Sequence, residues 1–116
     1  MTPAQAIASY RRKLKDTVVI RRYANVAGPH RPWFDAEVRA RVMGFAPDEL
    51  VGGIVQGDRR LIVLAEDLIA RQFPLPLRKG DKAIIRGREC NIEAPDDNTR
   101  RVQGVLIAYE LQVRGL

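Results

Sequence analysis

The sequence predicts a mainly β fold: a small β-barrel or sandwich of about six antiparallel strands, with a short N-terminal helix and one short internal helix. Three observations predict it: strict alternation of apolar and polar residues over 34–42, a second alternating run over 105–113, and a tight hairpin expected over 82–94. The 116 residues contain no repeat and no linker. We therefore expect a single β-barrel domain over 17–116, with 1–16 as an N-terminal helical appendage.

The N-terminal residues carry the signals that begin a helix. Thr2 can cap it, Pro3 fits the first helical position, and Gln5 sits where a capping-box partner belongs. One narrow apolar stripe follows at i, i+3, i+7 spacing: Ile7, Tyr10 and Leu14. Because the stripe is narrow, we expect the helix to pack against something beyond its own short turn of core, such as a neighbouring subunit.

The next segments predict two strands and an unusual excursion. A strand over 17–23 is followed by a Gly- and Pro-containing loop over 24–32 and by the alternating strand over 34–42. Two adjacent glycines then interrupt an apolar stretch and fit poorly inside a strand. We expect this loop to project from the barrel, towards a channel or a neighbour, and to move; the alternative is an edge strand folded onto its own core. Its residues are Leu50, Val51, Gly52, Gly53, Ile54, Val55, Gln56 and Gly57.

The second half predicts further strands in quick succession. Residues 59–64 form a strand that is apolar on both faces, so its end is buried, and 65–72 form a short helix with acids in its first turn. After an extended crossing over 73–77 comes the hairpin, with 94–104 as a polar loop. One long terminal strand then includes 105–113.

The hairpin is expected to turn at Gly87-Arg88, because glycine in the first position of a two-residue loop suits a type II′ turn. That register brings opposite charges together on one face and apolar groups together on the other, which is typical of a paired hairpin. The expected pairs are Arg86 with Glu89, Lys82 with Glu93, Ile85 with Cys90, and Ala83 with Ile92.

No combination of residues indicates catalysis, a metal or a cofactor. The lone histidine, His30, has no carboxylate or cysteine nearby in sequence, and Cys90 falls on an apolar strand face. We therefore expect neither an enzyme nor a cofactor. No apolar run is long enough to span a membrane, and the lone cysteine and the absence of a secretion signal favour a cytoplasmic origin.

The charge balance permits a polyanionic partner. Twenty Lys and Arg against 14 Asp and Glu give a net charge of +6, which allows contact with nucleic acid or an acidic protein surface. The arginines we expect to face phosphates are Arg59, Arg60, Arg100 and Arg101. Among the aromatic residues, Tyr23 and Trp33 look free to stack on bases. A nucleic-acid-binding β-barrel is therefore an alternative function.

Two segments resemble a known family. Residues 59–68 and 78–92, with a Gly-Asp turn at Gly80-Asp81 and a short Gly-Arg hairpin at Gly87-Arg88, are similar to the head–tail joining proteins of tailed bacteriophages, also called head-closure, stopper or neck proteins. The terminal strand, 104–115, fits the same order of strands. The resemblance covers 16–115.

The resemblance implies a structural virion protein that forms a homo-oligomeric ring. Portal or adaptor proteins would lie above the ring and tail proteins below it, and the ring would line or close the channel that DNA crosses. The protein would be made in the bacterial host cytoplasm and reside in the virion neck, in non-specific contact with packaged DNA and with no membrane. The sequence of a tail-terminator or a minor tail adaptor would show similar features.

Overall fold

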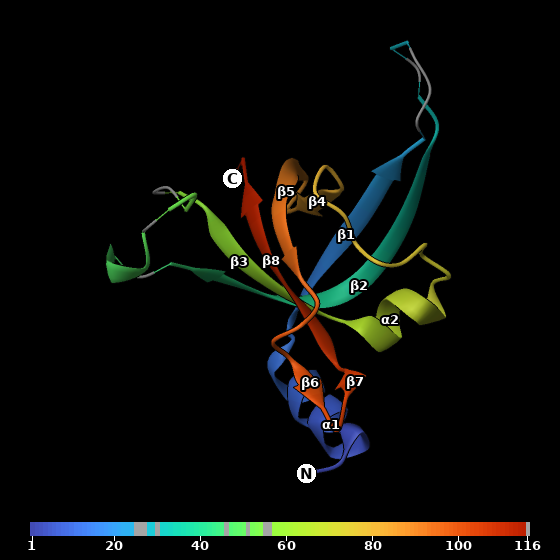
Figure 1. Ribbon diagram of the computed structural model, residues 1–116. Coiled ribbons are helices and arrows are strands. Elements are labelled where there is room, and N and C mark those ends of the chain that lie inside the picture. The colour runs from blue at the N-terminus through green and yellow to red at the C-terminus, as the bar shows by residue number, and fades with distance from the viewer. Residues whose placement is uncertain (25–27, 30, 46, 51, 55–56, 116) are drawn as a thin grey trace.

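Six strands close into an antiparallel barrel in the order β1-β2-β3-β8-β5-β4 (Figure 1). The computed structural model describes residues 1–24, 28–29, 31–45, 47–50, 52–54 and 57–115. Its elements are α1 (Pro3–Lys13), β1 (Asp16–Tyr23), β2 (Trp33–Gly44), the 3-10 turn η1 (Pro47–Glu49), β3 (Arg59–Leu64), α2 (Ala65–Ala70), β4 (Lys82–Ile85), β5 (Arg88–Asp96), β6 (Arg101–Val102), β7 (Val105–Leu106) and β8 (Ala108–Arg114). The predicted mainly β fold is confirmed, and the sheet closes as a barrel.

The barrel interior is filled by the apolar side of each alternating strand. Ala36, Val38 and Ala40 of β2 point inward between exposed polar neighbours, as the alternation predicted. Leu68 of α2 and Phe73, which follows it, join the same cluster. Burying each large apolar side chain contributes on the order of 1.5–3 kcal/mol, so this cluster is the main source of the fold's stability.

Strand β3 is buried on both faces, as its sequence predicted, and the structure identifies the cover. Leu61 and Val63 point into the barrel, while Ile62 and Leu64 point outward. The outward pair lies in a second cluster with Ala6 of α1 and with Leu14, the residue that follows the helix. The helix therefore packs on the outside of its own barrel.

Helix α1 begins as its sequence predicted. The Thr2 hydroxyl accepts a hydrogen bond from the Gln5 amide at 3.2 Å, and the Gln5 side chain accepts one from the Thr2 amide at 2.8 Å. The expected subunit contact is wrong for Leu14, which is 1% exposed within its own chain. Ile7 and Tyr10 also pack against that cluster, because β3 offers an apolar outer face.

The β4–β5 hairpin turns one residue earlier than the sequence predicted. Its turn residues are Arg86 and Gly87, with φ values of 51° and 79°; two positive values are typical of a type I′ turn. The pairs are Lys82 with Asn91, Ala83 with Cys90, Ile84 with Glu89, and Ile85 with Arg88. The expected pairs were wrong by two residues, but the inward and outward faces are unchanged, because strands have a period of two.

The C-terminal third contains a small hairpin that the sequence analysis missed. Strands β6 and β7 pair with each other across a turn at Gln103 and Gly104, both at positive φ. The polar loop expected over 94–104 is therefore confirmed only at 97–100, and the single terminal strand is confirmed only from Ala108 onward. Ile107 separates β7 from β8. Its amide donates a hydrogen bond to the Arg100 carbonyl at 3.0 Å, and its side chain is buried beneath α1.

The β1–β2 hairpin extends beyond the barrel (Figure 1). Strand β1 pairs with β4 only as far as Arg21, whereas its pairing with β2 continues to Tyr23 opposite Trp33. We call residues 21–24 and 31–35 the arm. The radius of gyration, 14.3 Å, exceeds the roughly 13 Å expected of a compact domain of this length, as an extended hairpin requires.

Candidate functional site

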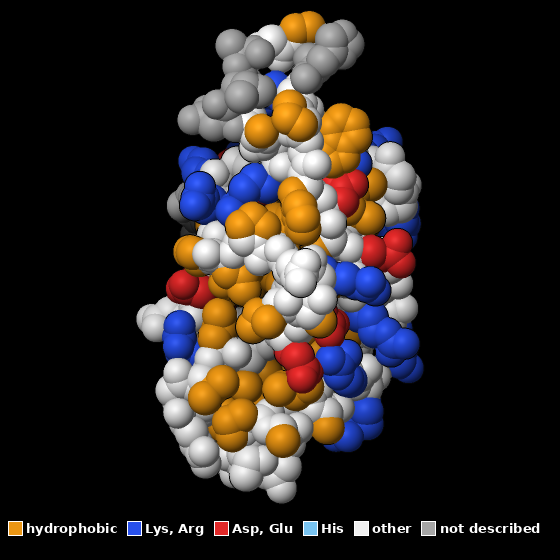
Figure 2. Space-filling model, turned by 90° about the vertical axis from the view of Figure 1, so that its right-hand side faces the viewer, with side chains coloured by type: hydrophobic (Ala, Val, Ile, Leu, Met, Phe, Trp, Pro, Cys, Tyr) orange, Lys and Arg blue, Asp and Glu red, His pale blue; other side chains and the backbone are white. Residues whose placement is uncertain are grey.

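The arm exposes aromatic side chains that arginines flank. Trp33 is 56% and Phe34 43% exposed. The Trp33 ring meets Tyr23 edge-on at 5.9 Å, and the Arg21 guanidinium lies 4.6 Å from the Trp33 ring centroid. Arg31 lies over the other ring, 4.9 Å from the Tyr23 centroid. Figure 2 shows hydrophobic side chains in a broken band down this side of the molecule, with Lys and Arg beside it.

The sequence analysis identified part of this surface. Trp33 is exposed as expected, but Tyr23 is half-buried and its hydroxyl donates to Glu89 at 2.9 Å. Phe34 is the first apolar residue of the alternating run predicted over 34–42, and unlike Ala36, Val38 and Ala40 it is not buried in the core. The barrel ends before Phe34, so this side chain packs edge-on against Phe73 at 5.8 Å and stays partly exposed.

Ion pairs join the two strands of the arm to each other and tie the arm to the barrel. Arg21 donates two hydrogen bonds to Asp35 at 2.7 and 2.9 Å, and this guanidinium holds the pKa of Asp35 below its usual value. Arg22 donates to the buried Asp81 at 2.7 and 2.8 Å, and Asp81 also accepts the Arg78 amide. The Gly-Asp turn of the resemblance is therefore a structural anchor for the base of the arm.

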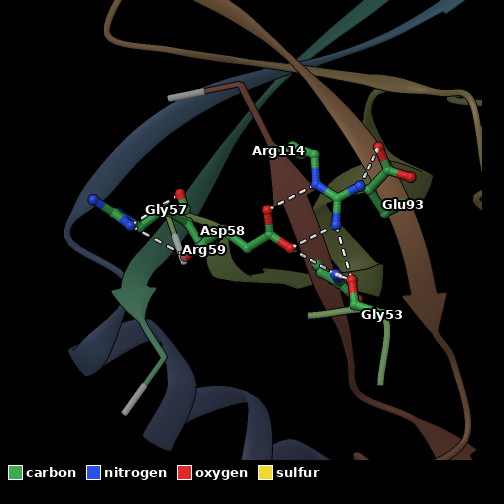
Figure 3. A network of polar contacts seen from close by, with 7 residues as sticks. Gly53, Gly57, Asp58, Arg59, Glu93 and Arg114 are labelled. Carbon is green, nitrogen blue, oxygen red and sulfur yellow. Dashed lines mark hydrogen bonds and ion pairs between the residues drawn. The ribbon is translucent and has the colours of Figure 1, made fainter. Parts of the chain in front are cut away.

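A second buried aspartate fastens the loop between β2 and β3 (Figure 3). Asp58 accepts hydrogen bonds from Arg114 at 2.9 and 3.0 Å and from Gln112 at 2.8 Å. The same two side chains donate to the Gly53 carbonyl, at 2.8 and 3.1 Å. Asp58 has 1% of its side chain exposed. The loop is thus tied to the outer side of β8 at Gly53.

This attachment bears on the loop predicted to project. Val51, Val55 and Gln56 lie outside the described residues, while Leu50 and Ile54 are half-buried. Ile54 lines a shallow depression over β8. At Gly53 the loop lies against its own barrel, so the expected projection is wrong at that point, while its movement stays a prediction. A role in an interface or a channel stays a prediction.

The four arginines expected to face phosphates all make contacts within the chain. Arg59 donates to the carbonyls of 57 and 58, and Arg101 to those of 97 and 104. Arg60 forms ion pairs with Glu49 and Glu110. Arg100 donates to Glu110 at 2.7 Å and to the Tyr10 hydroxyl at 2.8 Å.

Three of these arginines, Arg60, Arg100 and Arg101, line a groove of about 560 Å³ between α1, the outer side of β2 and β3, and the β6–β7 hairpin. We call it the basic groove. Its cationic lining residues are Lys13, Arg41, Arg60, Arg100 and Arg101, and no Asp or Glu appears among its lining residues that the structure describes. Residues from four separate segments therefore meet here.

The described residues include no cluster suited to binding a metal ion, and their cysteine is buried. Among them, no three His, Cys, Asp or Glu side chains gather as a metal site. Cys90 is 1% exposed, and burial raises the pKa of its thiol, so the reactive thiolate is disfavoured. His30 lies outside the described residues. In the described part of the chain, none of the helices has the length and apolar character needed to cross a bilayer.

Comparison of the sequence with models of known protein families and with curated proteins finds no match to either.

Proposed function

We propose that this protein is a structural subunit of a bacteriophage neck. It forms a ring that joins the DNA-filled capsid to the tail and lines or closes the DNA channel. Portal or adaptor proteins lie above the ring and tail proteins below it. The observation that carries the proposal is the arm, a firmly anchored hairpin that leaves the barrel and exposes Trp33 and Phe34.

The composition of the arm supports an interface. Trp, Tyr and Arg are enriched among the residues that dominate protein–protein binding energy, and the arm carries all three side by side. Exposed apolar patches rimmed by polar groups mark interaction sites. The core of the barrel does not include Trp33 or Phe34, so the exposed parts of these two rings are available to a neighbour.

A ring supports this use of the arm. Each subunit of a cyclic assembly presents one surface to the next subunit and a different surface to the previous one. An arm that extends beyond the barrel reaches a neighbour without opening the neighbour's own core. The Arg21–Asp35 pair joins the arm's two strands, and the Arg22–Asp81 pair ties the arm to the barrel. This order lowers the conformational entropy lost on assembly.

Mass photometry and negative-stain imaging of the purified chain over a concentration series test the proposal. We expect the wild type to form rings and Trp33→Ser/Phe34→Ser to remain monomeric. Ile69→Ser is the matched control, because Ile69 is 63% exposed on α2, away from the arm, and should assemble like the wild type. A chain that never assembles, and binds DNA tightly at low salt, would overturn the connector role.

That outcome would favour the second candidate, a nucleic-acid-binding barrel. The basic groove is the observation in its favour. A tail-terminator or minor tail adaptor would share the ring and the arm. Imaging of the ring bound to portal or to tail separates those positions, because each predicts a different neighbour.

A further inference from the structure

We propose that the basic groove binds the phosphate backbone of duplex DNA. The inference deepens the proposed neck function by locating the DNA contact, and it rests on that function for the source of the DNA. The contact itself requires only the folded chain. Figure 1 shows α1 and the β6–β7 hairpin together at one end of the molecule, where the groove lies between them.

The first argument is the number of cations without carboxylate partners. Lys13, Arg41 and Arg101 line the groove and form no ion pair with any residue that the structure describes. Lys13 and Arg41 are exposed. Like charges held close together repel one another, and a polyanion relieves that repulsion.

The second argument is the shared carboxylate behind the groove. Arg60 and Arg100 both pair with the same oxygen of Glu110, at 3.6 and 2.7 Å. The Nε of Arg100 is buried and has no acceptor among the described residues, although buried donors are usually paired. Because Arg60 also pairs with Glu49, the group left without an acceptor belongs to Arg100, and an anion in the groove would lie beside that guanidinium charge.

The third argument separates DNA from an acidic peptide. A peptide would need exposed apolar surface for its anchors, but the apolar floor residues Leu14, Ile62 and Ile107 are at most 3% exposed. The exposed residues of the groove include Lys13, Arg41 and Arg101 together with the apolar Met1, which is 76% exposed. Four of the five cations are arginines, whose forked guanidinium matches phosphate oxygens. The groove thus suits a backbone of phosphates.

The test measures binding of a fluorescent 20–30-base-pair duplex by anisotropy across a salt series. We expect Lys13→Gln/Arg41→Gln to weaken binding about tenfold and to reduce the magnitude of the salt slope by about two, because each lost phosphate contact removes roughly 0.9 from it. The matched control is Lys79→Gln/Arg88→Gln, which removes the same charge from exposed positions on the β4–β5 side. It should change affinity less than twofold.

Equal losses in the two double variants would overturn the proposal, because they would show that only net charge matters. Failure of the wild type to bind DNA would overturn it as well, and so would tighter, groove-dependent binding of oligoglutamate.

Competition by inorganic phosphate at matched total phosphate should be weak. Complete displacement of the duplex by inorganic phosphate would assign a free-phosphate site instead. Mass photometry of the same variants separates the two proposals. Rings that persist without DNA binding would support the connector role and contradict the DNA contact at the groove. DNA binding without rings would support the contact at the groove and contradict the connector role.

Discussion

Strand β3 and the arm differ in how far their apolar side chains are buried. On β3 the inward Leu61 and the outward Leu64 are both completely buried, the first by the barrel and the second by α1. On the arm, Trp33 and Phe34 remain about half exposed although ion pairs hold their strands. This difference shows that the exposure of Trp33 and Phe34 does not result from a poorly held backbone. Its polar anchors fix the backbone, while its apolar groups lack a cover within the described chain.

The largest expected effect tests the burial of β3. Leu61→Ala and Leu64→Ala remove the same group from opposite faces of one strand, and each should lower the free energy of unfolding by about 2–5 kcal/mol. Trp33→Ala should lower it by less than about 1 kcal/mol, since it removes only an exposed contact. Urea denaturation measures all three. A small effect of Leu64→Ala would contradict the covering role of α1.

The next effect tests the anchor of the arm. Asp81→Asn removes the charge that Arg22 contacts and should cost about 1–3 kcal/mol. Trp33 is the chain's single tryptophan, so its fluorescence reports on the arm directly. We expect faster quenching by acrylamide in Asp81→Asn than in the wild type. Asp97→Asn, at an exposed position, is the control; identical quenching in both variants would show that the arm does not depend on Asp81.

A smaller effect tests the second anchor, between Asp58 and Arg114. The Arg114 side chain is 40% exposed, so solvent reduces the strength of this pair. Arg114→Gln should lower the free energy of unfolding only slightly and speed amide hydrogen exchange near Gly53, whose carbonyl loses a donor. Exchange in β3 should stay unchanged. Unaltered exchange near Gly53 would mean that Gln112 alone fastens the loop.

The smallest effect is a pH dependence at the arm. Arg21 lowers the pKa of Asp35 in the folded protein below its reference value of 3.8. The unfolded chain therefore takes up the proton first, and the stabilisation is present above pH 3.8 and lost as the pH falls through the folded pKa. Carbon-detected NMR titration should find Asp35 titrating below 3.8 in the wild type and nearer 3.8 in Arg21→Gln. No difference between them would contradict the pairing.

Much of the fold could be predicted because its signals are local. The capping residues Thr2 and Gln5 specify the start of α1, and alternation specifies the inward face of β2. The apolar character of both faces of β3 correctly predicted double burial. The hairpin register could not be obtained in this way, since turns at 86–87 and at 87–88 place the same side chains on the same faces. Backbone dihedral angles at Arg86 decide between them.

The candidate sites depended far more on tertiary structure. The sequence by itself determined that the chain forms a basic, mainly β domain whose glycine-rich loop and arginine pairs stand apart from its alternating strands. Only the folded chain decided that Leu14 covers β3, that Phe34 lies past the end of the barrel, and that Lys13 meets Arg41 and Arg100 at one groove. The physical reason is that barrel closure and strand pairing join segments distant in sequence, and no local pattern encodes which of their side chains will meet.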